Sequence, residues 1–243
     1  TEEWNFDSTL SAGAWASGGN LNTARATARG ATGTQTAAII AGGISPDTAD
    51  SETYDGSSWT EGNNLTTARA NASATGTTTA ALHIGGSTNP GGNSDLVESY
   101  DGTNWTEIAD LNATRSDAGR AGTQTAAIFF AGYTTAYVGI NEEWNGTAWS
   151  EEADLNTDRG ILASAGATST AGLAIGGRRP GVNQALVESW DGSSWTEIAD
   201  INTARQGADG AGTTTAALVF GGGPPTTAVT ELYNGSNWTE VND

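Results

Sequence analysis

The side chains that could carry chemistry are few in this chain of 243 residues. It contains one histidine, His83, and no cysteine, and all nine basic residues are arginine. Thiolate metal sites, cysteine nucleophiles and nucleophilic triads therefore lack the groups that they require. His83 lies within an apolar run, where we expect a packed or exposed strand side chain. We predict no catalytic residue, no metal site and no cofactor.

Paired carboxylates are the remaining route to catalysis, because glycoside hydrolysis needs only two acidic side chains. The most regular candidates lie in phrases of the type YDGSSW, at Asp55, Asp101, Asn145, Asp191 and Asn234. Asx-Gly is a hairpin-turn signal, and a residue that recurs five times favours a structural role. The same reasoning applies to the arginines that recur once per repeat, which we expect to bond carbonyls or acidic partners between repeats: Arg25, Arg69, Arg115, Arg159 and Arg205.

Loops that differ between repeats are the better candidates for binding. Five such loops hold all five prolines, which stiffen a loop and reduce the entropy that it loses on binding. They carry aromatic, basic and polar side chains that we predict to form a ligand-binding face: Tyr133, Tyr137, Arg178, Arg179, Asn89, Asn93 and Asp47. The alternative is that these loops vary without binding anything.

The elements that must position these loops follow from an internal repeat. Tryptophans end six similar phrases, at Trp15, Trp59, Trp105, Trp149, Trp195 and Trp238, and their spacings are 44, 46, 44, 46 and 43 residues. Each full repeat contains four short segments bounded by Gly and Asx-Gly, which is typical of β-strands joined by tight turns. Four strands at a period in the forties predict a β-propeller blade.

The number of blades follows from the first strand of each repeat. Five such strands consist almost entirely of Gly, Ala, Ser and Thr, which suits the narrow axis of a five-bladed ring. The tryptophans and their aromatic partners would fill the wedges between blades. We predict one all-β, five-bladed propeller domain over residues 1–243, the alternative being six blades with one incomplete. Residues 1–15 form a surplus hairpin, which we expect to dock as a closing clasp within the chain or on a neighbouring subunit.

The charge of the chain limits its partners. The net charge is −19, which opposes binding to nucleic acid and to anionic membranes. No apolar run approaches the ~18 residues of a membrane-spanning segment. The first residue is Thr and Met is absent, so we expect a chain that is processed, excised from a longer protein or only partly recorded.

The order of arginine, small-residue strand, apolar strand, Gly-Gly, aromatic residue and tryptophan resembles the kelch repeat. The double glycines are Gly42-Gly43, Gly85-Gly86, Gly176-Gly177 and Gly221-Gly222, and the third repeat departs with Gly132-Tyr133. The phrases GTQTAAIIAGG and YDGSSWTE are most similar to kelch-like propellers of bacteriophage and marine viral structural proteins. The resemblance covers the whole chain, and it implies a virion appendage or surface protein rather than a metabolic enzyme.

We therefore expect a non-enzymatic structural or adhesive module, located on a virion or outside the cell. Its loops would face other virion or assembly subunits, a surface glycan or, in a homo-oligomer, another copy of the chain. Two alternatives stay open. One is a sialidase-like glycan hydrolase, and the other is an intracellular scaffold for protein interactions.

Overall fold

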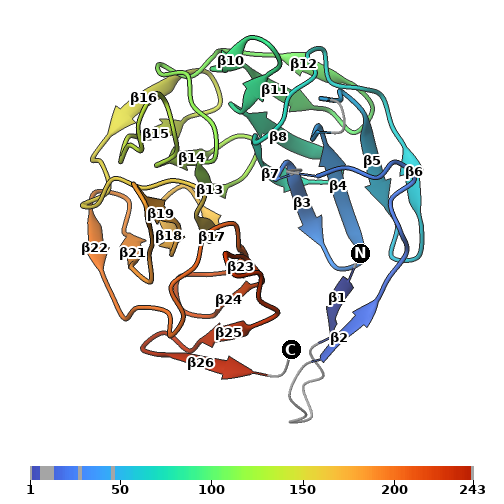
Figure 1. Ribbon diagram of the computed structural model, residues 1–243. Helices are drawn as coiled ribbons and strands as arrows, with labels where there is room; N and C mark the ends of the chain where they lie inside the picture. The colour runs from blue at the N-terminus through green and yellow to red at the C-terminus, as the bar shows by residue number, and fades with distance from the viewer. Residues whose placement is uncertain (1, 6–13, 27–28, 45–46, 242–243) are drawn as a thin grey trace. The chain divides into compact units, whose positions relative to one another are not determined.

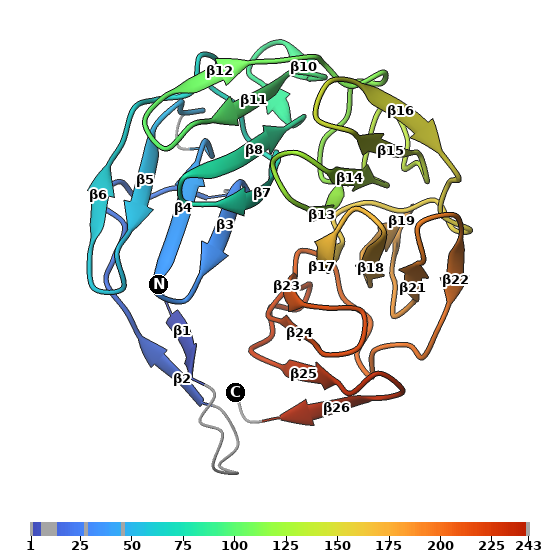
Figure 2. The same ribbon diagram turned by 180° about the vertical axis from the view of Figure 1, so that it is seen from behind.

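The protein consists of β-strands throughout its described part. The structure, a computed structural model, describes residues 2–5, 14–26, 29–44 and 47–241 (Figures 1 and 2). Within these ranges there is no helix, and hence none that could cross a membrane. Five four-stranded antiparallel sheets follow one another along the chain. The predicted all-β fold, a β-propeller of five four-stranded blades, is confirmed.

The blades are numbered in chain order. Blade 1 consists of β3 (Ala31–Thr34), β4 (Ala37–Ala41), β5 (Ser51–Tyr54) and β6 (Trp59–Glu61). Blade 2 consists of β7 (Ser73–Thr77), β8 (Ala80–Ile84), β11 (Val97–Tyr100) and β12 (Trp105–Glu107). Blade 3 consists of β13 (Gly119–Gly122), β14 (Ala127–Phe130), β15 (Asn141–Trp144) and β16 (Trp149–Glu152). Blade 4 consists of β17 (Ala163–Thr168), β18 (Ala171–Ile175), β21 (Val187–Trp190) and β22 (Trp195–Glu197). Blade 5 consists of β23 (Asp209–Gly212), β24 (Ala217–Phe220), β25 (Thr230–Tyr233) and β26 (Trp238–Val241).

Three two-stranded hairpins complete the strand inventory of the described residues. They are β1 (Glu2–Asn5) with β2 (Ala14–Ser17), β9 (Ser87–Thr88) with β10 (Gly92–Asn93), and β19 (Arg178–Arg179) with β20 (Val182–Asn183). In the first, the backbones of Trp4 and Trp15 lie opposite each other. The side chains of residues 1–16 lie outside the described part, so docking of this N-terminal hairpin stays a prediction.

The chain forms two compact units. The first contains residues 1–116, 123–125 and 146–149, and the second contains residues 117–122, 126–145 and 150–243. Blades 1 and 2 belong to the first unit, and blades 4 and 5 with most of blade 3 belong to the second. The expectation of a single domain over the whole chain stays a prediction.

Small residues let the first strands of neighbouring blades lie side by side within each unit. In the first unit β3 contacts β7, and the Thr32 hydroxyl donates to the Gly76 carbonyl at 2.9 Å. In the second unit β13 contacts β17, which contacts β23 (Figure 1). Arg120 is the one long side chain on these strands, and it donates to the Ser164 hydroxyl at 3.0 Å and to Asp209 at 3.4 Å.

Aromatic pairs build the core of each unit. The tryptophan that begins the last strand of a blade packs on the aromatic residue opposite it, as Trp105 does on Tyr100 with ring centroids 4.8 Å apart. Trp105 also lies in a cluster with Ile39 of blade 1 and with Leu65, which begins its own repeat. Trp195 contacts Phe130 of the preceding blade, with ring centroids 4.7 Å apart. Each such ring buries roughly 150–250 Å², which makes these contacts the main apolar link between blades.

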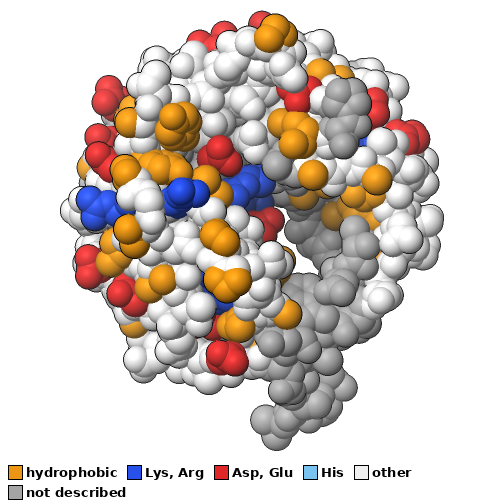
Figure 3. Space-filling view, in the orientation of Figure 1, with side chains coloured by type: hydrophobic (Ala, Val, Ile, Leu, Met, Phe, Trp, Pro, Cys, Tyr) orange, Lys and Arg blue, Asp and Glu red, His pale blue; other side chains and the backbone are white. Residues whose placement is uncertain are grey.

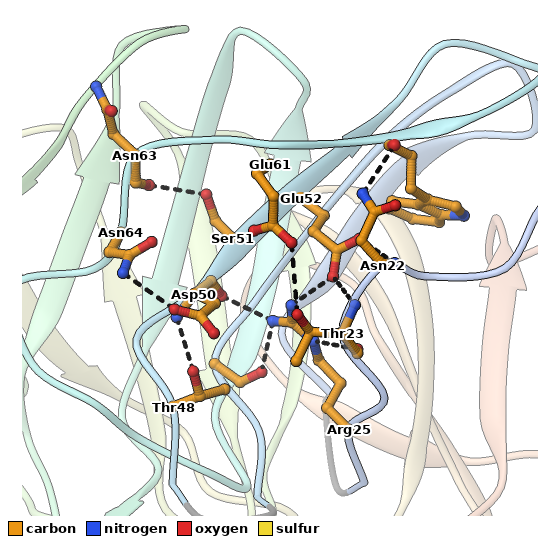
Figure 4. Close-up of polar contacts among 12 residues, drawn as sticks. Asn22, Thr23, Arg25, Thr48, Asp50, Ser51, Glu52, Glu61, Asn63 and Asn64 are labelled. Carbon is orange, nitrogen blue, oxygen red and sulfur yellow. Dashed lines mark hydrogen bonds and ion pairs between the residues drawn. The ribbon is translucent and has the colours of Figure 1, made fainter.

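The recurring arginines are buried, and Arg25, Arg69, Arg159 and Arg205 lie in ion pairs. Arg69 donates to Glu98 at 2.9 Å and to the carbonyls of Gly85 and Leu96, while the other oxygen of Glu98 accepts the Thr66 N–H at 2.7 Å. Arg25 with Glu52 (Figure 4) and Arg205 with Glu231 repeat this pairing. Arg159 pairs with Glu188 but donates to the carbonyls of Thr157 and Ala174, and Arg115 is equally buried. Burial lowers the pKa of Arg69 and Arg159, and the paired carboxylates oppose that shift. The acidic partner lies in the arginine's own repeat, so our expectation of acidic partners between repeats was wrong for these four pairs.

The backbone of the same arginines provides the link between repeats. The carbonyl of Arg69 accepts the N–H of Gly43 at 2.8 Å, and the carbonyl of Arg205 accepts that of Gly177 at 2.9 Å. Gly177 has a φ of 101°, and a Cβ there would lie 2.8 Å from the Gly160 carbonyl, so the second glycine of each pair has no room for a side chain. In blade 3 this position is Gly132, and Ala131, with a φ of 61°, replaces the first glycine. The third repeat therefore departs at Ala131-Gly132 rather than at Gly132-Tyr133.

The ion pairs predict a large loss of stability when one partner is removed. Glu98→Ala would leave the Arg69 charge buried without its carboxylate, and such losses amount to about 3–5 kcal/mol. We expect urea denaturation to show a fall of that size in the free energy of unfolding. Glu151→Ala, at an exposed position on the last strand of blade 3, is the control and should change it by less than ~0.5 kcal/mol. Equal effects of the two substitutions would contradict a structural role for the pair.

Candidate ligand-binding loops

The loops that follow the glycine pairs are built in two ways. Blades 2 and 4 extend them as the hairpins β9–β10 and β19–β20, and Pro180 and Gly181 form the turn of the second hairpin. Gly181 has a φ of 77°, which suits the turn position after a proline. In blade 3 the loop closes through a bridge between Tyr133 and Tyr137 instead. Arg178 and Arg179 form the first strand of the blade 4 hairpin.

Three of these loops meet in the second unit, from blades 3, 4 and 5. Gly160 lies between the first two loops. Its N–H donates to the Arg178 carbonyl at 3.1 Å and its carbonyl accepts the Arg178 N–H at 2.8 Å, which ties it to the blade 4 loop. A Cβ on Gly160 would lie 3.0 Å from Cδ1 of Tyr137 and from the Gly132 carbonyl, so the blade 3 loop packs directly on Gly160. Asn183 joins the second and third loops by donating to the Pro224 carbonyl at 3.1 Å. We call residues 133–138, 178–183 and 223–225 the loop cluster.

Charge and exposure distinguish the loop cluster from the rest of the chain. Arg178 is partly exposed and makes one weak side-chain bond, to the Gln206 amide oxygen at 3.4 Å. Arg179 is exposed, and its side chain has no hydrogen bond or ion pair within the described ranges. Figure 3 shows basic side chains over β19 with hydrophobic side chains beside them. In a chain of net charge −19, the adjacent Arg178 and Arg179 form a local patch of positive charge.

Apolar and aromatic groups adjoin these cations. Tyr133 is 38% exposed and Val182 is 59% exposed. The rings of Tyr133 and Tyr137 lie edge to face, with centroids 5.4 Å apart and planes at 69°. Exposed Tyr and Arg side chains beside apolar residues are the composition of binding hot spots.

The structure brings together four of the seven predicted binding residues, namely Tyr133, Tyr137, Arg178 and Arg179. The other three belong to the first unit, where Asn89 lies between the strands of the β9–β10 hairpin and Asn93 lies on β10. Asp47 lines a separate pocket of roughly 240 Å³ that includes Arg25 and Asp50. Sequence reasoning did not select Val182, Asn183 and Gln206, and only the position of the first two beside Arg178 and Arg179 could have indicated them.

The recurring acids of the YDGSSW phrases lie in turns. Hydrogen bonds from the Ser58 N–H and from the hydroxyl and N–H of Ser57 lower the pKa of Asp55 to about 2. The pKa of Asp101 is lowered in the same way by the N–H groups of Asn104 and Thr103. Asn234, which replaces the acid in blade 5, accepts the same kind of bond from the Ser236 N–H at 2.9 Å. An amide can thus take the position, which indicates that the turn uses the side-chain oxygen and not the charge.

His83 is buried in β8, and neither ring nitrogen has a hydrogen-bond partner in the described part of the molecule. Its pKa lies well below 6.5, because burial disfavours the imidazolium and the nearby Arg69 repels it. The Ala41 carbonyl acts in the opposite direction without completing a hydrogen bond. His83 is therefore a neutral core residue, and no group of three His, Asp or Glu side chains that could hold a metal ion occurs among the described residues.

No protein-family model matches the chain, and no curated protein matches it. The fold itself is consistent with a protein-interaction module. Because propellers support many unrelated activities, the function must be inferred from the loop cluster.

The burial of His83 predicts a loss of stability in mild acid. The unfolded chain binds a proton near pH 6.5 and the folded chain does not, so the free energy of unfolding falls as the pH drops below 6.5, by up to ~1.4 kcal/mol per pH unit. We expect His83→Phe to remove this loss, because Phe129 fills the equivalent position of β14. Urea denaturation of both proteins between pH 7.5 and 5 measures the difference. Parallel pH profiles would show that His83 is protonated in the folded state.

Proposed function

We propose that the protein is a non-enzymatic binding module that presents the loop cluster to a partner. It would serve as a structural or adhesive part of a phage particle or of another extracellular assembly, where the partner is a neighbouring subunit or a surface glycan. One observation carries the proposal. The arginines that recur are enclosed in buried ion pairs, whereas Arg178 and Arg179 project from a short hairpin beside two tyrosines.

Four ionisable groups outside the loop cluster support the non-enzymatic part of the proposal. An acid or base catalyst needs a pKa near the working pH. The pKa of Asp55 is about 2, those of Asp101 and Asp191 are also lowered, and His83 is buried and neutral. These groups keep one protonation state around pH 7, which suits turns and cores better than proton transfer.

The exposed outer strands support a module that binds through its loops. Each of these strands carries an exposed glutamate, such as Glu61 on β6, Glu107 on β12 and Glu197 on β22. Charge on an edge strand discourages sheet-to-sheet pairing with other chains. The excess of negative charge likewise disfavours nucleic acid and anionic membranes as partners. Recognition is then left to the loops, as in other rigid scaffolds.

We expect a substitution in the arginine hairpin to abolish binding without affecting the fold. Arg178→Ser with Arg179→Thr gives β19 the residues of β9, Ser87 and Thr88, which form the first strand of the corresponding hairpin in blade 2. The wild-type protein should bind a ligand on a glycan array or a purified product of a neighbouring gene, and the double variant should lose at least ~10-fold in affinity. Ser87→Ala with Thr88→Ala, in the blade 2 hairpin, is the matched control and should bind like the wild type.

The same preparations separate the proposal from its rivals. A panel of glycan substrates should show no turnover, and release of any sugar would identify a hydrolase and overturn the non-enzymatic assignment. Binding that both double variants retain equally would place recognition outside the loop cluster. Partners found exclusively among cytoplasmic proteins would favour an intracellular scaffold.

A further inference from the structure

The loop cluster has the chemistry of a site for a ligand that is both charged and partly apolar. The guanidinium of Arg179 has no partner in the described ranges, and Arg178 makes one weak bond, so both have donors available. A guanidinium presents its N–H groups as a planar fork that fits a carboxylate in a bidentate manner. The first requirement of the ligand is therefore an anionic oxygen group.

The second requirement comes from the tyrosines. Tyr133 and Tyr137 form an edge-to-face pair, and Tyr133 is 38% exposed. A tyrosine offers an apolar ring together with a polar hydroxyl. This surface suits a ligand whose apolar C–H groups and hydroxyls alternate over a short distance, as they do on a sugar ring.

The two groups are held at a fixed separation. Tyr137 packs over Gly160, whose backbone makes two hydrogen bonds with Arg178. On the other side of the hairpin, the Asn183 amide bonds the Pro224 carbonyl. Such ordered loops lose little conformational entropy on binding, so a small ligand can be held by few contacts.

The size of the loop cluster argues for an extended saccharide over a folded protein. Three short loops of one unit form it, whereas a stable protein interface takes about 20–30 residues from each side. We infer that the loop cluster binds a carboxylate-bearing saccharide, with the carboxylate on Arg178 and Arg179 and the sugar ring against Tyr133 and Tyr137. This inference rests on the proposed function, because it specifies the ligand of the same binding face.

Oligogalacturonate is the probe, and neutral maltooligosaccharide of the same length is its uncharged control. Isothermal titration calorimetry at about 0.15 M salt suits the measurement, because charges more than ~8 Å away are then largely screened. We expect the protein to bind oligogalacturonate and not the neutral oligomer. Arg178→Ser with Arg179→Thr should weaken binding at least ~10-fold, and Tyr133→Ala with Tyr137→Ala should weaken it severalfold. The control with Ser87→Ala and Thr88→Ala should bind like the wild type.

Poly-L-glutamate supplies the same charge without sugar rings and separates the two components of the site. Binding of both polymers with equal affinity, insensitive to the tyrosine substitutions, would reduce the cluster to a charge contact and overturn the saccharide inference. Failure to bind oligogalacturonate would also overturn it. The proposed function would survive either result if another partner still required Arg178 and Arg179. Hydrolysis of bound oligogalacturonate would instead refute the non-enzymatic function and leave the saccharide assignment intact.

Discussion

The buried Arg–Glu pair is the interaction on which the rest of the structure depends. In one repeat it joins the arginine, the carbonyl of the first glycine of the pair and the glutamate of the third strand, as Arg69, Gly85 and Glu98 do. The backbone carbonyl of the same arginine accepts an N–H from the glycine pair before it. Because a buried ion without its partner costs several kcal/mol, each repeat is held to one geometry. Small residues on the first strand and aromatic residues at the outer strands pack around this fixed geometry, and some of the tryptophans add an indole hydrogen bond, as Trp149 does to the Ala109 carbonyl.

Arginine therefore has two roles in the molecule, as a buried structural ion and as a surface group in a loop. Arg159 and Arg178 are close in the chain, yet the first is fully buried against Glu188 and the second rises on a hairpin at the surface. The buried ion pair and the glycine pair fix the start of each loop at the second glycine. The rest of the loop can vary in sequence. Blade 2 uses that freedom for a neutral hairpin, and blade 4 uses it for a basic one. A rigid scaffold with variable loops is a common basis for recognition.

Much of the fold follows from local patterns, because each repeat must satisfy the same packing and turn chemistry. The tryptophan period, the small-residue strands and the Asx-Gly turns indicated five blades, and these turns have the expected bonds at Asp55 and Asn234. The acidic partners of the arginines were misplaced, because each arginine lies in the loop before the first strand and its long side chain reaches the third strand of its own blade, as Arg69 reaches Glu98. The candidate site was predictable only in part. Tyr137 and Arg178 meet through Gly160, which belongs to neither loop and carries no side chain to indicate a role.

The central claim is that burial separates the structural arginines from those available to a ligand. Modification of the native protein by phenylglyoxal, followed residue by residue by mass spectrometry, tests it most directly. We expect Arg179 to react fastest and Arg178 next, with Arg69, Arg115, Arg159 and Arg205 protected until urea unfolds the chain. Reaction of any of these four at the rate of Arg179 in the folded protein would contradict the claim.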